Sequence, residues 1–199
     1  MDPNVVIERL KRLAKLDSAV FDEVRDDPQE LVPSLIVAAV SCILAGVGAF
    51  LWWKVMWDFS DPDSLVVNTI VLGSVFLFVA LYVGAVVAWV AMAQIYKVEA
   101  DLQVVLRTVG YGAAPLALSI FMFIPVVWPV FSLVPLGLLF VMMIYALQSS
   151  TNADSRQVVL STAIGYAAFV AVAGIVATQF ADPGDAPIGA GQFAVLFEY

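Results

Sequence analysis

The stretch that decides the fold is TVGYGAAPLALSIFMFIPVVWPVFSLVPLGLLFVMMIYALQSSTNA, residues 108–153, which carries no charge between Arg107 and Asp154. A membrane-spanning helix needs about 20 apolar residues, so these 46 residues are too many for one crossing and enough for two. Pro125 and Pro129 lie near the middle, and each removes a backbone donor and clashes with the preceding turn. The stretch therefore predicts two helices, 109–127 and 130–148, joined by a tight turn. A re-entrant hairpin that does not cross is the alternative.

Three further uncharged stretches have the length of a membrane helix. The first, 33–53, begins with a proline, which a helix tolerates in its first turn. The second, 65–96, belongs to an uncharged run of 33 residues, roughly 50 Å as a helix, so it must tilt or project beyond the lipid. The last, 158–180, follows Asp154 and Gln157, whose spacing resembles a capping box.

Composition agrees with this pattern, because 62% of the 199 residues are hydrophobic and only 13% are charged. About 25% charged is usual for a soluble domain. The sequence predicts an all-α integral membrane bundle of five transmembrane helices.

Lysine and arginine are distributed unevenly around these spans. Lys54 lies on one side, and the other eight lie on the opposite side: Arg9, Lys11, Arg12, Lys15, Arg25, Lys97, Arg107 and Arg156. Because positive residues favour the cytoplasmic side, we expect a cytoplasmic N-terminus and an outside C-terminus. The chain then divides into cytoplasmic or interfacial helices (1–30), a five-span domain (31–181) and an extracytoplasmic tail (182–199).

Residues 1–30 predict two short amphipathic helices on the cytoplasmic surface. In the first, four apolar residues recur at helical spacing: Val6, Leu10, Leu13 and Leu16. Lys11, Arg12 and Lys15 project from the opposite side as a basic face. The two helices either lie in the membrane interface or pack on the spans. Residues 98–109 predict a similar surface helix.

Two kinds of candidate contact lie within the spans. Small residues recur every fourth position, which allows close helix packing inside the protein or in a dimer: Ala80, Gly84, Ala88, Ala163, Ala167 and Ala171. At the start of the third span, Tyr111, Gly112 and Pro115 predict a kink or unwound turn, with a small binding surface as the alternative.

The composition also argues against several chemistries. The chain has no histidine and a single Cys42, so we expect no catalytic, cofactor or metal site. No charged residue falls inside a predicted span, which disfavours a coupled transporter. A net charge of −8 disfavours binding to nucleic acid.

Several short motifs resemble the prokaryotic branch of the Yip domain family over residues 13–176. They comprise Leu16, Asp17, Phe21, Asp27-Pro28, the segment 107–115 (RTVGYGAAP), Ile124-Pro125, Trp128, Asn152, Ala153 and Arg156. The resemblance implies five spans, a cytoplasmic N-terminus and a place in a prokaryotic cell membrane. Eukaryotic members bind small Rab-type GTPases in vesicle traffic, but they usually have a longer N-terminal region.

We therefore expect a non-enzymatic membrane-organising adaptor or scaffold, in contact with membrane lipids and with another protein or a second copy. One alternative is a lipid or small-solute conduit through the breaks at Pro115, Pro125 and Pro129. Another is an accessory subunit that uses Ala80, Gly84 and Ala88 as its contact row.

Overall fold

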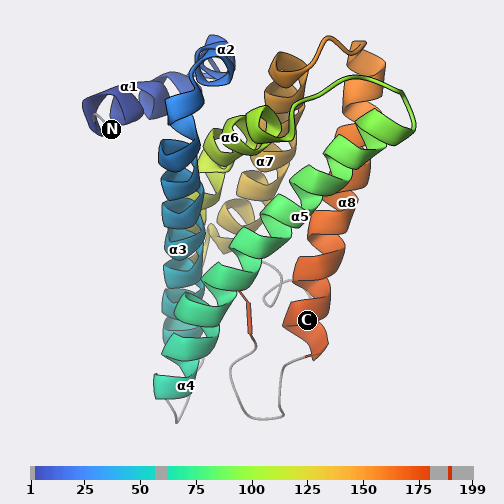
Figure 1. The fold of residues 1–199 in the computed structure, drawn as a ribbon. Coiled ribbons are helices and arrows are strands. Elements are labelled where there is room, and N and C mark those ends of the chain that lie inside the picture. Colours follow the sequence, from blue (N-terminus) through green and yellow to red (C-terminus); the bar gives the residue numbers. More distant parts are fainter. Residues whose placement is uncertain (1–2, 57–61, 180–187, 190–199) are drawn as a thin grey trace.

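The protein is an all-helical bundle (Figure 1). A computed structural model describes residues 3–56, 62–179 and 188–189. Two short helices, α1 (Pro3–Leu13) and α2 (Ala19–Asp26), and a 3-10 turn, η1 (Pro28–Glu30), precede the long elements. The described residues form helices and no strand, so the predicted all-α class is confirmed.

Five described segments are long and apolar enough to cross a membrane, which confirms the predicted number. The first is α3 (Leu31–Met56), and the second joins α4 (Pro62–Val66), the π-helical η2 (Val67–Leu72) and α5 (Gly73–Gln94). The third joins α6 (Leu102–Gly112) to the 3-10 helix η3 (Ala114–Phe123). The last two are α7 (Trp128–Ser150) and α8 (Ser155–Gln179). Apart from 188–189, the predicted tail 182–199 lies outside the described residues.

The long second segment crosses the bundle diagonally. Figure 1 shows α5 running from beside α3 at one end towards the start of α8 at the other. Its most extensive packing is against α8, while α3 packs mainly on η3. A helix too long for a perpendicular crossing can adopt such an inclination, so its excess length fits inside the bundle.

The third segment differs from the prediction. Residues 98–109 do not form a separate surface helix. Instead α6 starts at Leu102, where Asp101 caps it by accepting a hydrogen bond from the Gln103 amide at 2.8 Å, and it continues to Gly112. Pro115 cannot donate to the Tyr111 carbonyl, and the α-helix ends at Gly112. The chain continues as η3, whose buried residues repeat every third position, as a 3-10 helix requires: Leu116, Ser119 and Met122. Arg107 consequently lies inside the third segment, and it is buried.

The ends of α7 and α8 follow local sequence rules. Ile124 is extended, with ψ of 113°, as expected for a residue before proline, and α7 begins at Trp128 with Pro129 in its first turn. Before α8, the Asp154 amide donates to Gln157 Oε1 at 3.2 Å, which is one half of the predicted capping box.

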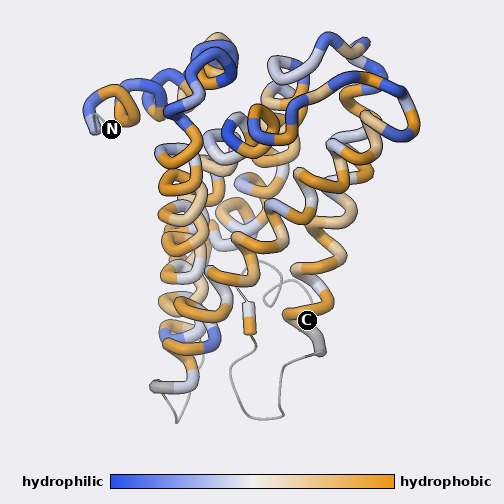
Figure 2. The backbone as a smooth tube through the Cα atoms, viewed as in Figure 1, coloured by the Kyte–Doolittle hydropathy of each residue, from blue (hydrophilic) through white to orange (hydrophobic). Residues whose placement is uncertain are grey.

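Hydrophilic residues gather at the ends of the bundle, as Figure 2 shows. One end carries residues 3–26, the 95–101 loop, α6 and the start of α8, which together hold eight of the nine cations. Lys54 lies at the other end, in the last turn of α3. We call the first of these the charged end.

Candidate functional site at the charged end

The first feature of the charged end is a platform of two helices, α1 and α2 (residues 3–26). Their apolar residues join the same buried core as α3, α6 and α7: Val6, Leu13, Val20, Phe21 and Val24. Burying one such side chain contributes about 1.5–3 kcal/mol, so the platform is part of the folded protein. Leu16, predicted on the same apolar face, instead follows the end of α1 with a positive φ of 61° and is exposed.

A buried polar network joins this platform to two other segments. Arg9 Nη1 of α1 lies 2.5 Å from Glu30 Oε1, just before α3. The Tyr111 hydroxyl of α6 donates to Glu30 Oε2 at 2.7 Å. Both charged side chains are only 11% exposed, and Tyr111 is fully buried. Burial lowers the pKa of Arg9, but Glu30 and Tyr111 outweigh that effect and the pKa is raised, so Arg9 stays charged.

Sequence reasoning missed this network. Glu30 lies just before the first predicted span and was given no role, and Arg9 was only one of the cations counted for orientation. Glu30 and Tyr111 are 81 residues apart, and no local spacing indicates that they meet. The available signal was a carboxylate next to an apolar run, because a buried charge requires a partner.

A second set of hydrogen bonds holds α2 against α6 and α7. Arg107 Nη2 donates to the Arg25 carbonyl, and Arg25 Nη1 donates to the Ser149 carbonyl at 3.1 Å. The Ser149 hydroxyl donates to Asp22 Oδ1 at 2.7 Å. The platform is therefore fixed at both of its helices.

The predicted basic face is smaller than its three residues suggest. Arg12 contacts Asp17 at 2.7 Å and Glu23 at 2.6 Å, across the turn between α1 and α2. Lys11 and Lys15 are exposed. The cationic surface presented to solvent by this face therefore consists mainly of Lys11 and Lys15, while Arg12 has a structural role.

The turn between α1 and α2 should respond to acid. The Arg12 guanidinium, and then the Ala19 amide at 3.1 Å, hold the pKa of the Asp17 carboxyl below its usual value. A carboxyl of this kind stabilises the fold above its unfolded pKa, about 3.9, and loses that contribution as the pH falls through the lower folded pKa. We expect hydrogen-exchange protection of the Ala19 amide to fall over this range. Asp17→Asn should remove the pH dependence, and a protection that stays constant in the unsubstituted protein would contradict the assignment.

The small-residue row of α5 faces the protein interior. Ala80, Gly84 and Ala88 are buried, and the backbones of Gly84 and Gly165 approach so closely that a Cβ on Gly84 would lie 2.8 Å from the Gly165 carbonyl oxygen. This contact lies between α5 and α8 of one chain.

The small-residue row of α8 requires a correction. Ala163, Ala167 and Ala171 are all exposed and do not pack inside the protein. The residues that meet α5 lie on the neighbouring face of the helix, at Gly165 and Phe169. The four-residue spacing identified one face of α8, but it did not indicate whether that face packs against another helix of the protein.

The kink motif also lies in the interior. Tyr111 is fully buried, and a Cβ on Gly112 would lie 3.6 Å from Met142. Gly112 is buried as well, whereas Pro115, just after the change from α to 3-10 helix, is half-buried. Tyr111 therefore belongs to the buried network with Glu30 and is not exposed for the small binding surface considered for this motif.

The arrangement of apolar helices with charges gathered at their ends defines an integral, multi-pass membrane protein. The model of the Yip1 domain matches residues 16–178, and the chain belongs to the Yip1 domain family. The matched region begins after α1 and includes the other described helices almost completely. No curated protein and no solved structure matches the chain significantly.

Proposed function

We propose that the protein is a non-enzymatic membrane adaptor that presents its charged end to a partner protein in the cytoplasm. The observation that carries this proposal is the fixed platform: α1 and α2 are held by the Arg9–Glu30–Tyr111 network and by the bonds from Arg107 and Arg25. A docking surface that is ordered before binding avoids the entropy cost of ordering it during binding.

The orientation is part of the proposal. Eight cations at the charged end and only Lys54 at the other favour a cytoplasmic N-terminus and an outside C-terminus. The resemblance to the prokaryotic branch of the family supports a prokaryotic cell membrane as the location. With this orientation the platform faces the cytoplasm, where a protein partner can reach it.

Three buried threonine hydroxyls within the membrane segments support a non-enzymatic role. Those of Thr69, Thr108 and Thr162 each donate to a carbonyl four residues earlier in their own helix. A hydroxyl nucleophile requires a neighbouring base, and these groups contact the backbone instead.

Charge reversal on the platform should reduce partner binding without unfolding the protein. The variant Lys11→Glu/Lys15→Glu changes two exposed side chains, so its stability should stay within about 0.5 kcal/mol of the original. Binding should weaken about tenfold if both cations contact an acidic partner. The measurement is photo-crosslinking in native membranes, with the probe placed next to these residues, together with a melting curve of the purified variant.

Two controls separate docking from folding. Lys54→Glu reverses a charge at the opposite end and should leave the crosslinked products unchanged. Arg12→Glu breaks two internal ion pairs and should lower the melting temperature as well. If crosslinking at the platform is the same with and without the Lys11 and Lys15 substitutions, the adaptor proposal fails.

A further inference from the structure

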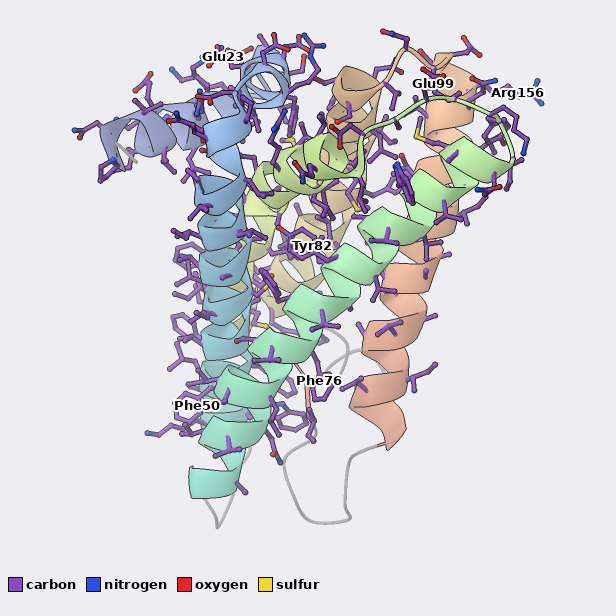
Figure 3. The ribbon with its side chains drawn as sticks, viewed as in Figure 1. Glu23, Phe50, Phe76, Tyr82, Glu99 and Arg156 are labelled. Carbon is purple, nitrogen blue, oxygen red and sulfur yellow. The ribbon has the colours of Figure 1, made fainter. Side chains whose placement is uncertain are left out.

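The charged end contains a cavity that the helices of the platform do not line. Its volume is about 400 Å³, and it lies where the chain leaves α5 and where α8 begins. Figure 3 labels one of its residues, Arg156, at the edge of this end. The lining residues are Tyr96, Asp154, Arg156, Gln157 and Leu160. Small-molecule sites usually occupy about 300–1,000 Å³, so the cavity has room for one small polar group.

Two opposite charges line this cavity without pairing. Within the described residues, neither the Asp154 carboxylate nor the Arg156 guanidinium takes part in an ion pair. They are two positions apart at the start of a helix, and side chains at that spacing do not face each other. A ligand that carries a negative and a positive group could therefore contact both.

Two polar neighbours add donors to the same cavity. Gln157 uses its side-chain oxygen to accept from the Asp154 amide, which leaves its amide NH₂ directed elsewhere and available as a donor. Tyr96 contributes a phenolic hydroxyl. Phosphate oxygens accept hydrogen bonds from arginine, amide and hydroxyl donors, and arginine binds them with two parallel N–H groups.

The cavity continues into an apolar surface. Leu160, one of its lining residues, is 43% exposed, and Ala163, Ala167 and Ala171 follow on the same face of α8. All three alanines are exposed and have small side chains, and we call this exposed row the track on α8. In a membrane protein such a track is the place where a lipid chain can lie.

We propose that this cavity binds the headgroup of a zwitterionic phospholipid with a primary amine, of the phosphatidylethanolamine type. The phosphate lies against Arg156 and Gln157, and the ammonium lies against Asp154. One acyl chain follows Leu160 and the three exposed alanines. A primary ammonium donates hydrogen bonds to a carboxylate, whereas the quaternary ammonium of phosphatidylcholine has no N–H to donate, so the site distinguishes the two lipids. A phospholipid with a net negative charge and no amine is repelled by Asp154.

The test is a lipid competition with the full chain. The protein is reconstituted in bilayer discs that contain equal amounts of phosphatidylethanolamine, phosphatidylcholine and phosphatidylglycerol with identical acyl chains. Lipids that remain bound after gentle release are counted by native mass spectrometry. We expect phosphatidylethanolamine to be retained about tenfold over either competitor, the ratio expected from one charge-assisted hydrogen bond.

Two variants assign the contacts. Asp154→Asn keeps the shape of the side chain, and asparagine is also favoured at a helix N-cap, but the negative charge is lost. The ratio of retained phosphatidylethanolamine to either competitor should therefore fall to nearly one. Arg156→Gln should reduce retention of all three lipids. Lys97→Gln, at the same end but outside the cavity lining, is the matched control and should change nothing. Melting curves of each variant confirm that it remains folded.

Three results would overturn the proposal. The first is equal retention of the three lipids by the unsubstituted protein. The second is a preference for phosphatidylethanolamine that survives in a folded Asp154→Asn variant. The third is binding of soluble glycerophosphoethanolamine as strong as that of the whole lipid, which would show that the track on α8 holds no acyl chain.

Discussion

Replacing Gly165 with leucine is expected to destabilise the bundle by about 3 kcal/mol or more, at or above the upper end of overpacking effects. A Cβ at this position would collide with the Gly84 carbonyl oxygen and lie 2.6 Å from the Ala88 Cβ. Neither neighbour can rotate away, because one is backbone and the other is attached directly to it. Since α5 packs most extensively on α8, separating these helices disrupts the main contact of both. Thermal unfolding of the purified protein in detergent measures the effect.

Gly137→Leu is the matched control for this substitution. A Cβ on Gly137 would meet nothing within 4 Å, and leucine favours a helix more than glycine does, so stability should be unchanged or slightly higher. Gly84→Leu should behave like Gly165→Leu, even in the absence of any partner protein. A Gly84→Leu protein that melts normally but loses a bound subunit would show that this row contacts another protein, as the accessory-subunit hypothesis requires.

Glu30→Gln is expected to cost about 3 kcal/mol and to release α1 from the bundle. Removing one member of a buried ion pair leaves the other charge without compensation, and this typically costs about 3–5 kcal/mol. Arg9 retains a weaker contact at 3.5 Å with Glu23, which places the expected value at the lower end. The melting temperature and the rate of proteolysis between α1 and α2 measure the two effects.

A double-mutant cycle tests whether the pair acts as a unit. Arg9→Met combined with Glu30→Gln should destabilise less than the sum of the two single changes, because neither uncompensated charge remains. Glu8→Gln supplies the control, since Glu8 and Lys11 are 65% and 66% exposed and 3.9 Å apart, and such pairs contribute less than about 1 kcal/mol. Additive effects of Arg9→Met and Glu30→Gln would argue against a coupled network.

The membrane segments could be predicted from the sequence because long uncharged apolar runs of this length seldom occur outside membrane-spanning helices. The run before Lys54 became α3, and Pro125 and Pro129 divided the run 108–153 at the observed turn. The start of the third segment could not be placed in the same way. Charged and polar residues at 99–107 suggested a surface helix, yet Arg107 is buried by contacts with α2, which no pattern within 98–109 indicates.

The candidate site was predictable only in part. The exposure of Lys11 and Lys15 follows from helical periodicity, but the structural roles of Arg9 and Arg12 depend on carboxylates in other segments. The outward position of Ala163, Ala167 and Ala171 depends on which helix α8 packs against. Side-chain periodicity defines faces, and tertiary packing decides what each face meets.

The composite third segment has a consequence for how the chain enters the membrane during synthesis. Leu102–Phe123 is the least apolar of the five described candidate spans, and it carries Arg107. An arginine costs about 2.5–3.5 kcal/mol at the centre of a span that inserts alone. Its partner, the Arg25 carbonyl, is made earlier on the ribosome, and α7 follows after a short turn. The third segment should therefore insert as a hairpin with α7, after α2 and α3 have already been made.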